Sequence, residues 1–152
     1  MPALEWKREG YLITTDPARV DLDAVHGFLT ECYWAKGIPR EVVRRSIEHS
    51  IPFSVLAADR LAGFARVVTD RATVAYLGDV FVLEEFRGRG LGAWLMSAIV
   101  SHPDLQGLRR WILLTRDAHG LYDKIGFTSL RKPERWMERW DPDVYARPAE
   151  PA

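Results

Sequence analysis

Apolar and polar residues alternate with two different periods along the first third of the chain. Residues 11–15 (YLITT) alternate with a period of two, which predicts a short strand. Over residues 21–34 the apolar positions recur at helical spacing, and Asp21 is placed to cap this first helix. Residues 38–50 predict a second helix, because Pro39 favours a first helical turn and the following apolar residues fall on one side.

Three longer apolar runs come next, and each is bounded by a short polar turn. These runs cover residues 53–58, 61–69 and 73–83, which predicts three consecutive antiparallel strands. An amphipathic run over residues 91–101 then predicts a third helix, which His102-Pro103 terminates.

The last third of the chain carries weaker signals of the same two kinds. Residues 109–115 (RRWILLT) predict a buried strand, and residues 120–126 predict a short helix that ends at a glycine. Two further strands are expected around Phe127 and Trp136. The element order is therefore βααβββαβαββ, which predicts an α+β or mixed α/β fold.

Length and charge narrow the class of protein. A chain of 152 residues fits one domain, residues 1–152, with an ordered core expected over roughly 10–142. Lys plus Arg (21) balances Asp plus Glu (21), so no overall field would recruit nucleic acid or a membrane. Cys32 is the single cysteine, which excludes an intramolecular disulfide. No long apolar run and no HExxH motif occurs, so a cytoplasmic protein without a metal site is expected.

The strongest chemical signal is RGRGLG, residues 87–92, which lies between a predicted strand and a predicted helix. Its three glycines permit backbone conformations in which successive N–H groups turn toward one anion. The helix that begins there directs its positive end to the same place. Arg87 and Arg89 add guanidinium groups that suit a diphosphate. A phosphorylated cofactor is therefore predicted, although an ordinary strand-to-helix turn would use the same glycines.

A dinucleotide-binding protein is one alternative interpretation of this loop. Gly88, Gly90 and Ala93 satisfy the GxGxx(G/A) pattern. That fingerprint normally opens a long parallel domain, whereas here antiparallel strands are predicted before the loop and only about 60 residues follow it. The architecture therefore disfavours a dinucleotide.

Two motifs make the chain resemble the GNAT superfamily of acyl-coenzyme A N-acyltransferases over nearly its whole length. The first is an Arg/Gln-x-x-Gly-x-Gly/Ala loop after a strand, which stands here as Val82, Arg87, Gly90 and Gly92. The second is the family's A-x-x-LY-x-K-x-GF pattern, which stands here as Ala118, Leu121, Tyr122, Lys124, Gly126 and Phe127. The resemblance implies a twisted mixed sheet, flanked by helices and splayed between residues 73–83 and 109–115.

The resemblance also implies the cofactor and its contacts. Acetyl-coenzyme A would place its pantetheine arm in the splay, against the backbone of Phe81 and Val82, and its diphosphate on the glycine loop. Thr115 stands where the family often has asparagine, so its contact would have a shorter reach. The expected cofactor-binding residues are Phe81, Val82, Arg87, Gly88, Arg89, Gly90, Leu91, Gly92, Thr115 and Tyr122.

The implied reaction is direct transfer of an acetyl group to a primary amine, and three residues are its catalytic candidates. Tyr122 would protonate the leaving thiolate, because the family's equivalent tyrosine lies beside the thioester sulfur. Asp79 would take the proton of the amine, or else accept structural hydrogen bonds at a strand bulge. His119 would be a proton shuttle, or else a surface or capping residue. A backbone N–H at Phe81 or Val82 would face the oxyanion.

The resemblance also implies that the acceptor meets the first two helices and their connection. Aromatic side chains there would hold an amine by cation–π contact, and an arginine would hold a carboxylate. The candidate substrate-binding residues are Tyr33, Trp34, Arg40, Ser46 and Arg66. These residues would equally serve as core, lid or solvated surface, and the identity of the acceptor stays open. A non-catalytic acyl-coenzyme A sensor is the second hypothesis, and the final strands and tryptophans would suit a homodimer.

Overall fold

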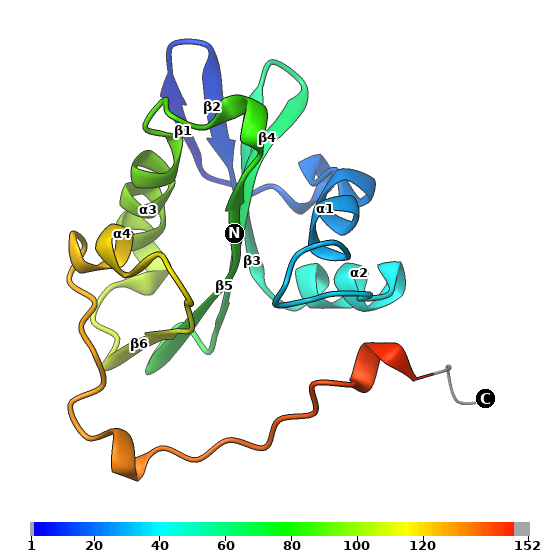
Figure 1. The fold of residues 1–152 in the computed structure, drawn as a ribbon. Coiled ribbons are helices and arrows are strands. Elements are labelled where there is room, and N and C mark those ends of the chain that lie inside the picture. The colour runs from blue at the N-terminus through cyan, green and yellow to red at the C-terminus, as the bar shows by residue number, and fades with distance from the viewer. Residues whose placement is uncertain (1, 148–152) are drawn as a thin grey trace.

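The computed structural model describes residues 2–147 and consists of one central sheet with helices on both of its faces (Figure 1). The strands are β1 (Glu5–Arg8), β2 (Tyr11–Thr14), β3 (Ile51–Ala57), β4 (Arg60–Thr69), β5 (Val74–Val82) and β6 (Arg110–Leu113). The α-helices are α1 (Leu22–Leu29), α2 (Arg40–Glu48), α3 (Leu91–Ser101) and α4 (His119–Asp123). Short 3-10 turns include η2 (Glu84–Phe86), η3 (Pro103–Leu105) and η4 (Pro133–Arg135).

The sheet is mixed, as the sequence predicts. Its six strands lie in the order β1-β2-β3-β4-β5-β6, and every neighbouring pair from β1 to β5 is antiparallel. β6 instead pairs with β5 in parallel, which requires a crossover, and α3 supplies it. The predicted α+β class is confirmed.

Two apolar clusters fill the two faces of the sheet. β3 and β4 are buried along almost their whole length, which explains their continuous apolar runs. Phe53 and Leu95 belong to the cluster under α3 and α4, whereas Phe64 and Val43 belong to the cluster under α1 and α2. Side chains of neighbouring strand residues therefore point to opposite faces, and each face is covered by its own pair of helices (Figure 1).

Local signals set the helix starts. The Asp21 carboxylate accepts a hydrogen bond from the Ala24 N–H at 3.0 Å, which confirms the predicted cap of α1. Pro39 directly precedes α2 and lies at its cap position, one residue before the predicted first turn. α3 begins after Gly90, whose φ of +75° is left-handed, and ends before His102 as predicted.

Two predictions at the ends of the chain are wrong. β1 lies before the expected start of the core and forms a hairpin with β2 that turns at Gly10, where φ is +79°. No strand follows β6 within the described residues, so the strands expected around Phe127 and Trp136 do not form. Pro133 opens a 3-10 turn there, and residues 128–144 are exposed, so no burial stabilises a strand in a single copy.

The parallel strand is also shorter than expected. β6 spans four residues, whereas the sequence predicts a strand over residues 109–115. Its apolar side chains are only half-buried, and Leu114 beyond its end is 81 % exposed. No helix between residues 2 and 147 has the length and apolar character needed to cross a bilayer.

Candidate functional site

The glycine loop lies between η2 and α3 and leaves open space for a ligand. Gly88 and Gly90 have φ values of +78° and +75°, a left-handed conformation that favours glycine. A Cβ added at Gly88 or Gly92 would meet nothing within 4 Å. The first N–H groups of α3 have no partner within the helix, so they add a positive end to this space.

Arginine side chains surround the loop. Arg87 donates from Nε to the Val82 carbonyl at 2.9 Å, and Arg89 donates from Nη1 to the Tyr11 hydroxyl at 2.8 Å. Arg8 of β1 lies over the Trp94 ring at 4.9 Å, which places a third guanidinium near the start of α3. Because each of these guanidinium groups has five N–H donors, most of its donors stay available to an anion.

The sheet splits beside this loop. β5 pairs with β6 only from Val74 to Leu77, opposite Arg110 to Leu113. On its other edge β5 continues to pair with β4 as far as Val82. The edge of β5 that carries Phe81 and Val82 toward β6 therefore lacks a strand partner among the described residues. This opening confirms the splay expected between the two strands.

A bulge in β5 lies at the start of the splay. Asp79 has a φ of +53°, and the β4–β5 register shifts opposite it, between Phe64 and Arg66. Arg66 donates from Nε to one Asp79 oxygen at 2.6 Å, and Trp34 donates from Nε1 to the other at 3.0 Å. The Asp79 side chain is 11 % exposed. The carboxylate is thus held by a cation and an indole, which are the contacts of the structural alternative, and its role as a base stays a prediction.

Aromatic side chains connect the α1–α2 connection to the splay. Phe28 stacks on Phe81 with ring centroids 4.0 Å apart, and Trp34 lies 6.1 Å from Phe28. Tyr33 contacts Trp34 edge to face at 5.2 Å. The Arg116 guanidinium lies 3.8 Å from the Tyr33 ring centroid, so the connection also reaches the segment after β6. Three distant parts of the chain therefore meet at the open end of the splay.

Tyr122 of α4 supplies an unusual hydroxyl. Its side chain is buried, at 8 % exposure, and its ring lies 6.0 Å from that of Phe127. Within residues 2–147 this hydroxyl forms no hydrogen bond that would occupy it. Burial raises the pKa of Tyr122 above its ordinary value near 10, and the nearby Tyr33 phenol raises it further. The group is therefore a protonated donor at neutral pH.

Comparison with known proteins places this arrangement in a family. The pattern of the Acetyltransferase (GNAT) family matches residues 21–127. The chain belongs to this acetyltransferase family. A Gibberella zeae protein assigned as an acetyltransferase is 31 % identical, and the match covers 84 % of this chain and 84 % of its own.

Solved structures agree with this membership of the GNAT family. A Xanthomonas campestris structure, assigned to GNAT acetyltransferases, is 48 % identical with a TM-score of 0.88 and covers 90 % of this chain and 97 % of its own. A glucosamine-6-phosphate N-acetyltransferase from Arabidopsis thaliana shares the fold at 17 % identity and a TM-score of 0.62, covering 86 % and 97 % of the two chains. This second likeness concerns the fold alone.

Acetyl-coenzyme A is the typical co-substrate of GNAT proteins, and the residues present fit it. Gly88 and Gly92 leave room for a diphosphate, because a Cβ at either position would project into open space. Phe81 and Val82 lie on the unpaired edge of β5, where an extended amide-containing arm can form strand-like hydrogen bonds. Among the described residues, no group of three or more His, Cys, Asp or Glu could hold a metal ion.

The structure brings only part of the predicted site together. Arg40 forms an ion pair with Asp23 at 2.7 Å, and Ser46 donates to the Val43 carbonyl within its own helix. His119 is exposed at the first position of α4. These predicted roles stay predictions. The residues that do contact one another at the splay are Tyr33, Trp34, Arg66, Asp79 and Phe81, the last through Phe28.

At three residues near the site the observed contacts differ from those expected from the sequence. Thr115 accepts a hydrogen bond from the Ala118 N–H at 3.0 Å, so its hydroxyl shapes the turn before α4. Arg8 and Arg116 were not predicted, because their hydrogen-bond partners, the Gly90 carbonyl and the Tyr33 hydroxyl, lie 82 and 83 residues away along the chain. Arg116 directly follows Thr115, and this position could have indicated a residue near the site. No pattern in the local sequence indicated Arg8.

Proposed function

We propose that this GNAT protein transfers an acetyl group from acetyl-coenzyme A to the primary amine of an acceptor. The observation that carries the proposal is the unpaired edge of β5 beyond Leu77, which has the glycine loop at one end. Tyr122 of α4 would supply the proton donor, because burial raises the pKa of its phenol and keeps it protonated at neutral pH. In this proposal one opening would combine a phosphate site, a backbone edge and a proton donor.

Cofactor binding follows from the loop and the strand edge. The N–H groups at the start of α3 and the guanidinium groups of Arg87 and Arg89 would hold the diphosphate. The backbone of Phe81 and Val82 would pair with the amides of the pantetheine arm. When bound, the thioester supplies an activated acyl group. The residues of the protein would orient the amine, stabilise the oxyanion and move the protons.

The amine must lose a proton before it attacks. An alkylammonium has a pKa near ~10.4 in water, so it is almost fully charged at neutral pH. Asp79 can accept one more hydrogen bond at each oxygen, although Arg66 and Trp34 already donate to it. His119 is the other candidate, and its exposed position allows proton exchange with water. We propose that Asp79 orients the ammonium and that the proton leaves through Asp79 or His119.

The acyl step needs a stabilised oxyanion and a protonated leaving group. The amine nitrogen forms a bond to the carbonyl carbon, and the carbon–sulfur bond then breaks. A backbone N–H of Phe81 or Val82 would donate to the oxyanion. Tyr122 would give its proton to the departing sulfur and recover one from solvent, so no covalent enzyme intermediate is required.

The acceptor would enter from the aromatic side of the splay. Tyr33 and Trp34 are 50 % and 42 % exposed, so their faces are accessible to a cationic amine. Arg66 donates from Nε to Asp79 and from Nη1 to the Ser50 hydroxyl, which leaves fewer of its N–H groups for a carboxylate. We therefore propose a cationic amine without a neighbouring carboxylate as the preferred acceptor class.

The deciding experiment measures coenzyme A release and acetylated product over a panel of primary amines. Gly92→Asp places a carboxylate in the proposed diphosphate site, and Gly92→Asn is its neutral control of equal size. Both side chains suit the first turn of α3, so the fold should persist. Gly92→Asp should weaken coenzyme A binding about 10²-fold or more, because like charges would meet there.

Two results would overturn the proposal in different ways. Equal affinity of the Asp and Asn variants for coenzyme A would show that the diphosphate lies elsewhere. Tight coenzyme A binding with no turnover on any amine would instead support the acyl-coenzyme A sensor, which keeps the fold and lacks the catalysis.

A further inference from the structure

β6 is an edge strand whose outer side is open. The sheet ends at β6, and no strand among residues 2–147 lies beyond it. The Arg110 N–H donates to the Thr73 carbonyl at 3.3 Å, so the Arg110 backbone faces β5. Successive residues of a strand direct their N–H and C=O groups to opposite edges, so the backbone of Trp111 faces outward. An unpaired edge of this kind can pair with another extended chain.

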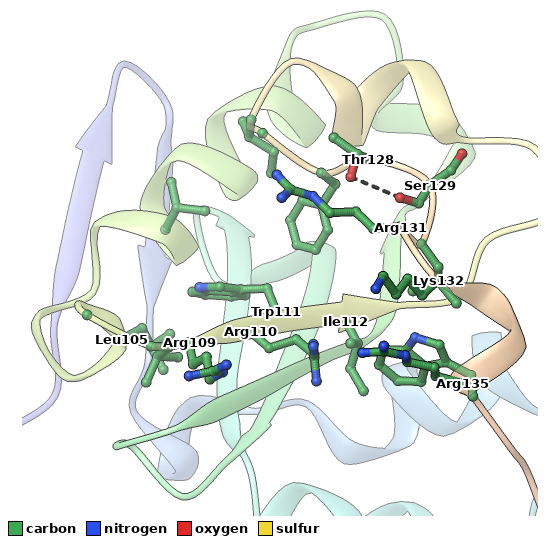
Figure 2. A pocket seen from close by; sticks show the side chains of 18 of the residues that line it. Leu105, Arg109, Arg110, Trp111, Ile112, Thr128, Ser129, Arg131, Lys132 and Arg135 are labelled. Carbon is green, nitrogen blue, oxygen red and sulfur yellow. Dashed lines mark hydrogen bonds between the residues drawn. The ribbon is translucent and has the colours of Figure 1, made fainter.

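The chain that follows α4 returns past this edge and borders a groove with it (Figure 2). The groove has a volume of about 1090 Å³ and is lined by residues 105–112, 125–132, 135 and 136. Pockets for small molecules usually have volumes of ~300–1,000 Å³. The groove is therefore large enough for several residues of an extended peptide.

Aromatic contacts hold the returning chain beside β6. The Phe127 ring lies 6.3 Å from the Trp111 ring, edge to face. Farther along the chain, the Arg110 guanidinium lies 5.3 Å from the centroid of the Trp136 ring. Because both contacts form within one copy of the chain, a ligand would meet a groove whose walls are already ordered.

The groove carries charge of one sign. Over the whole chain Lys plus Arg balances Asp plus Glu, at 21 each, yet no acidic residue lines the groove among the described residues. Its cationic residues are Arg109, Arg110, Arg131, Lys132 and Arg135. None of them forms an ion pair within residues 2–147. A groove of one sign concentrates ligands of the opposite charge.

The cations lie on both faces of the open edge. Trp111 packs against the cluster under α3 and α4. Arg110 points to the opposite face, because side chains alternate along a strand. In the view of Figure 2, Arg131 lies above β6 and Arg135 lies below it. A chain that adds to this edge would therefore meet a cation on whichever face it presents its carboxylates.

Backbone and charge together select the class of ligand. A nucleic acid would use the cations, but its backbone has no N–H to donate to the Trp111 carbonyl. An extended peptide can match both the N–H and the C=O groups of a strand edge. Its carboxylates also match the forked N–H groups of arginine. An acidic peptide is therefore the ligand that uses every feature of the groove.

We propose that this groove binds an acidic segment of a partner protein, which adds to the sheet as an extended strand beside β6. β6 has four residues, so about four residues of the segment would pair with it. The cations would attract the segment, and the backbone hydrogen bonds would fix its position. This inference does not depend on the proposed reaction, because the groove lies on the edge of β6 that faces away from β5.

Binding of a labelled peptide to the full chain tests the proposal. The probe is a fluorescein-labelled peptide of about eight residues in which glutamate and valine alternate, and fluorescence anisotropy measures its dissociation constant. We expect a value of about 100 µM or lower at low ionic strength. Raising the salt from about 0.05 to 0.5 M should weaken binding at least ~10-fold. The same peptide with lysine in place of glutamate should not bind.

Two charge reversals separate the groove from the rest of the surface. Arg131→Glu lies in the groove, whereas Lys7→Glu lies on β1 at the opposite edge of the sheet. Both side chains are exposed, and both variants change the net charge by the same amount. Arg131→Glu should raise the dissociation constant at least ~10-fold, and Lys7→Glu should leave it nearly unchanged. Unfolding temperatures show that each variant remains folded.

A modified peptide tests the backbone pairing separately. Methylation of its two central amide nitrogens removes one donor from each edge of the peptide and leaves every charge in place. The methylated peptide should bind at least ~10-fold more weakly, because strand pairing is lost on either edge.

Four results would overturn the proposal. The first is no binding of the glutamate peptide at about 1 mM. Equal effects of Arg131→Glu and Lys7→Glu would place the peptide on another surface, and equal affinity of the methylated peptide would exclude pairing with β6. Tighter binding of a single-stranded oligonucleotide of equal charge would make the groove a nucleic-acid site. A stable dimer in sedimentation that does not bind the peptide would place a second copy of the chain there.

Discussion

At the scale of single residues, two polar side chains near the splay differ in their hydrogen bonds. Both oxygens of Asp79 accept hydrogen bonds, from Arg66 and from Trp34. The Tyr122 ring packs among apolar neighbours, and its hydroxyl has no hydrogen-bond partner among residues 2–147, but that oxygen is not one of the fully enclosed polar atoms there. The hydroxyl is therefore free to donate to a ligand.

Replacing Tyr122 by phenylalanine isolates this hydroxyl, because the ring and its packing remain. We expect turnover to fall about 10²- to 10⁴-fold, the usual contribution of a general acid, with coenzyme A affinity nearly unchanged. Steady-state kinetics and coenzyme A titration measure the two quantities separately. Unchanged turnover would remove Tyr122 from the mechanism.

The pH dependence of turnover provides a second readout of Tyr122. The protonated phenol is the active form, so activity is lost as pH rises through the pKa of Tyr122. Because burial raises that pKa above 10, the wild-type rate should hold through pH 9 and fall only above about 10. The fall should be absent in Tyr122→Phe. A wild-type decline centred well below pH 9 would contradict this assignment.

At the scale of elements, α3 links the glycine loop at one end to a buried histidine at the other. His102 ends the helix, is 4 % exposed, and accepts a hydrogen bond at Nδ1 from the Asp104 N–H at 3.0 Å. Only a neutral imidazole can accept that bond. Burial lowers the pKa of His102 below its ordinary 6.5, the Asp104 carboxylate opposes this, and Arg71 adds to it.

This cap predicts how stability changes with pH. Between the folded and unfolded pKa values of His102, the unfolded chain binds more protons, so the free energy of unfolding rises with pH. The contribution is complete above the unfolded value near 6.5 and is lost as pH falls below it. His102→Asn keeps a capping acceptor that does not titrate.

Denaturant unfolding of the wild type and of His102→Asn between pH 5 and 8 measures the difference. We expect the wild type to lose more stability than the variant on acidification below pH 6.5. Parallel curves for the two proteins would mean that His102 does not contribute to the acid dependence.

At the scale of the whole molecule, the splay is a consequence of topology. Five antiparallel neighbours form a continuous sheet, and β6 joins only at the end, over four residues, after the crossover through α3. Helices cover both faces, but beyond Leu77 no strand among the described residues pairs with the β6 side of β5. A ligand that fills the splay would join two parts of the sheet and stabilise the native state.

Coenzyme A should therefore raise the unfolding temperature. At about 100 times its Kd, a ligand specific for the native state adds about 2.7 kcal/mol, or roughly 5–10 °C for a chain of this size. Thermal unfolding with coenzyme A, and with NAD as the matched control, measures this shift. Stabilisation by NAD alone would favour the dinucleotide interpretation of the glycine loop.

The sequence by itself determined the elements whose signals are local. The apolar runs of β3 to β5, the Asp21 cap and the glycines of the loop each act through neighbouring residues, so periodicity and backbone preference were sufficient. The prediction for Tyr122 also rests on a local signal, because its motif occupies one contiguous stretch, and its role stays a prediction. Matches to the GNAT motifs then supplied the fold and the expected position of the splay.

Only the tertiary structure decided the features that depend on distant contacts. β1 is an exposed edge strand that needs β2 beside it, and its charged sequence hid it. The pairing of Asp79 with Trp34 spans 45 residues, and no local pattern encodes it. The alternation around Trp136 predicted a strand, yet a strand requires a partner, and none lies beside this segment among residues 2–147.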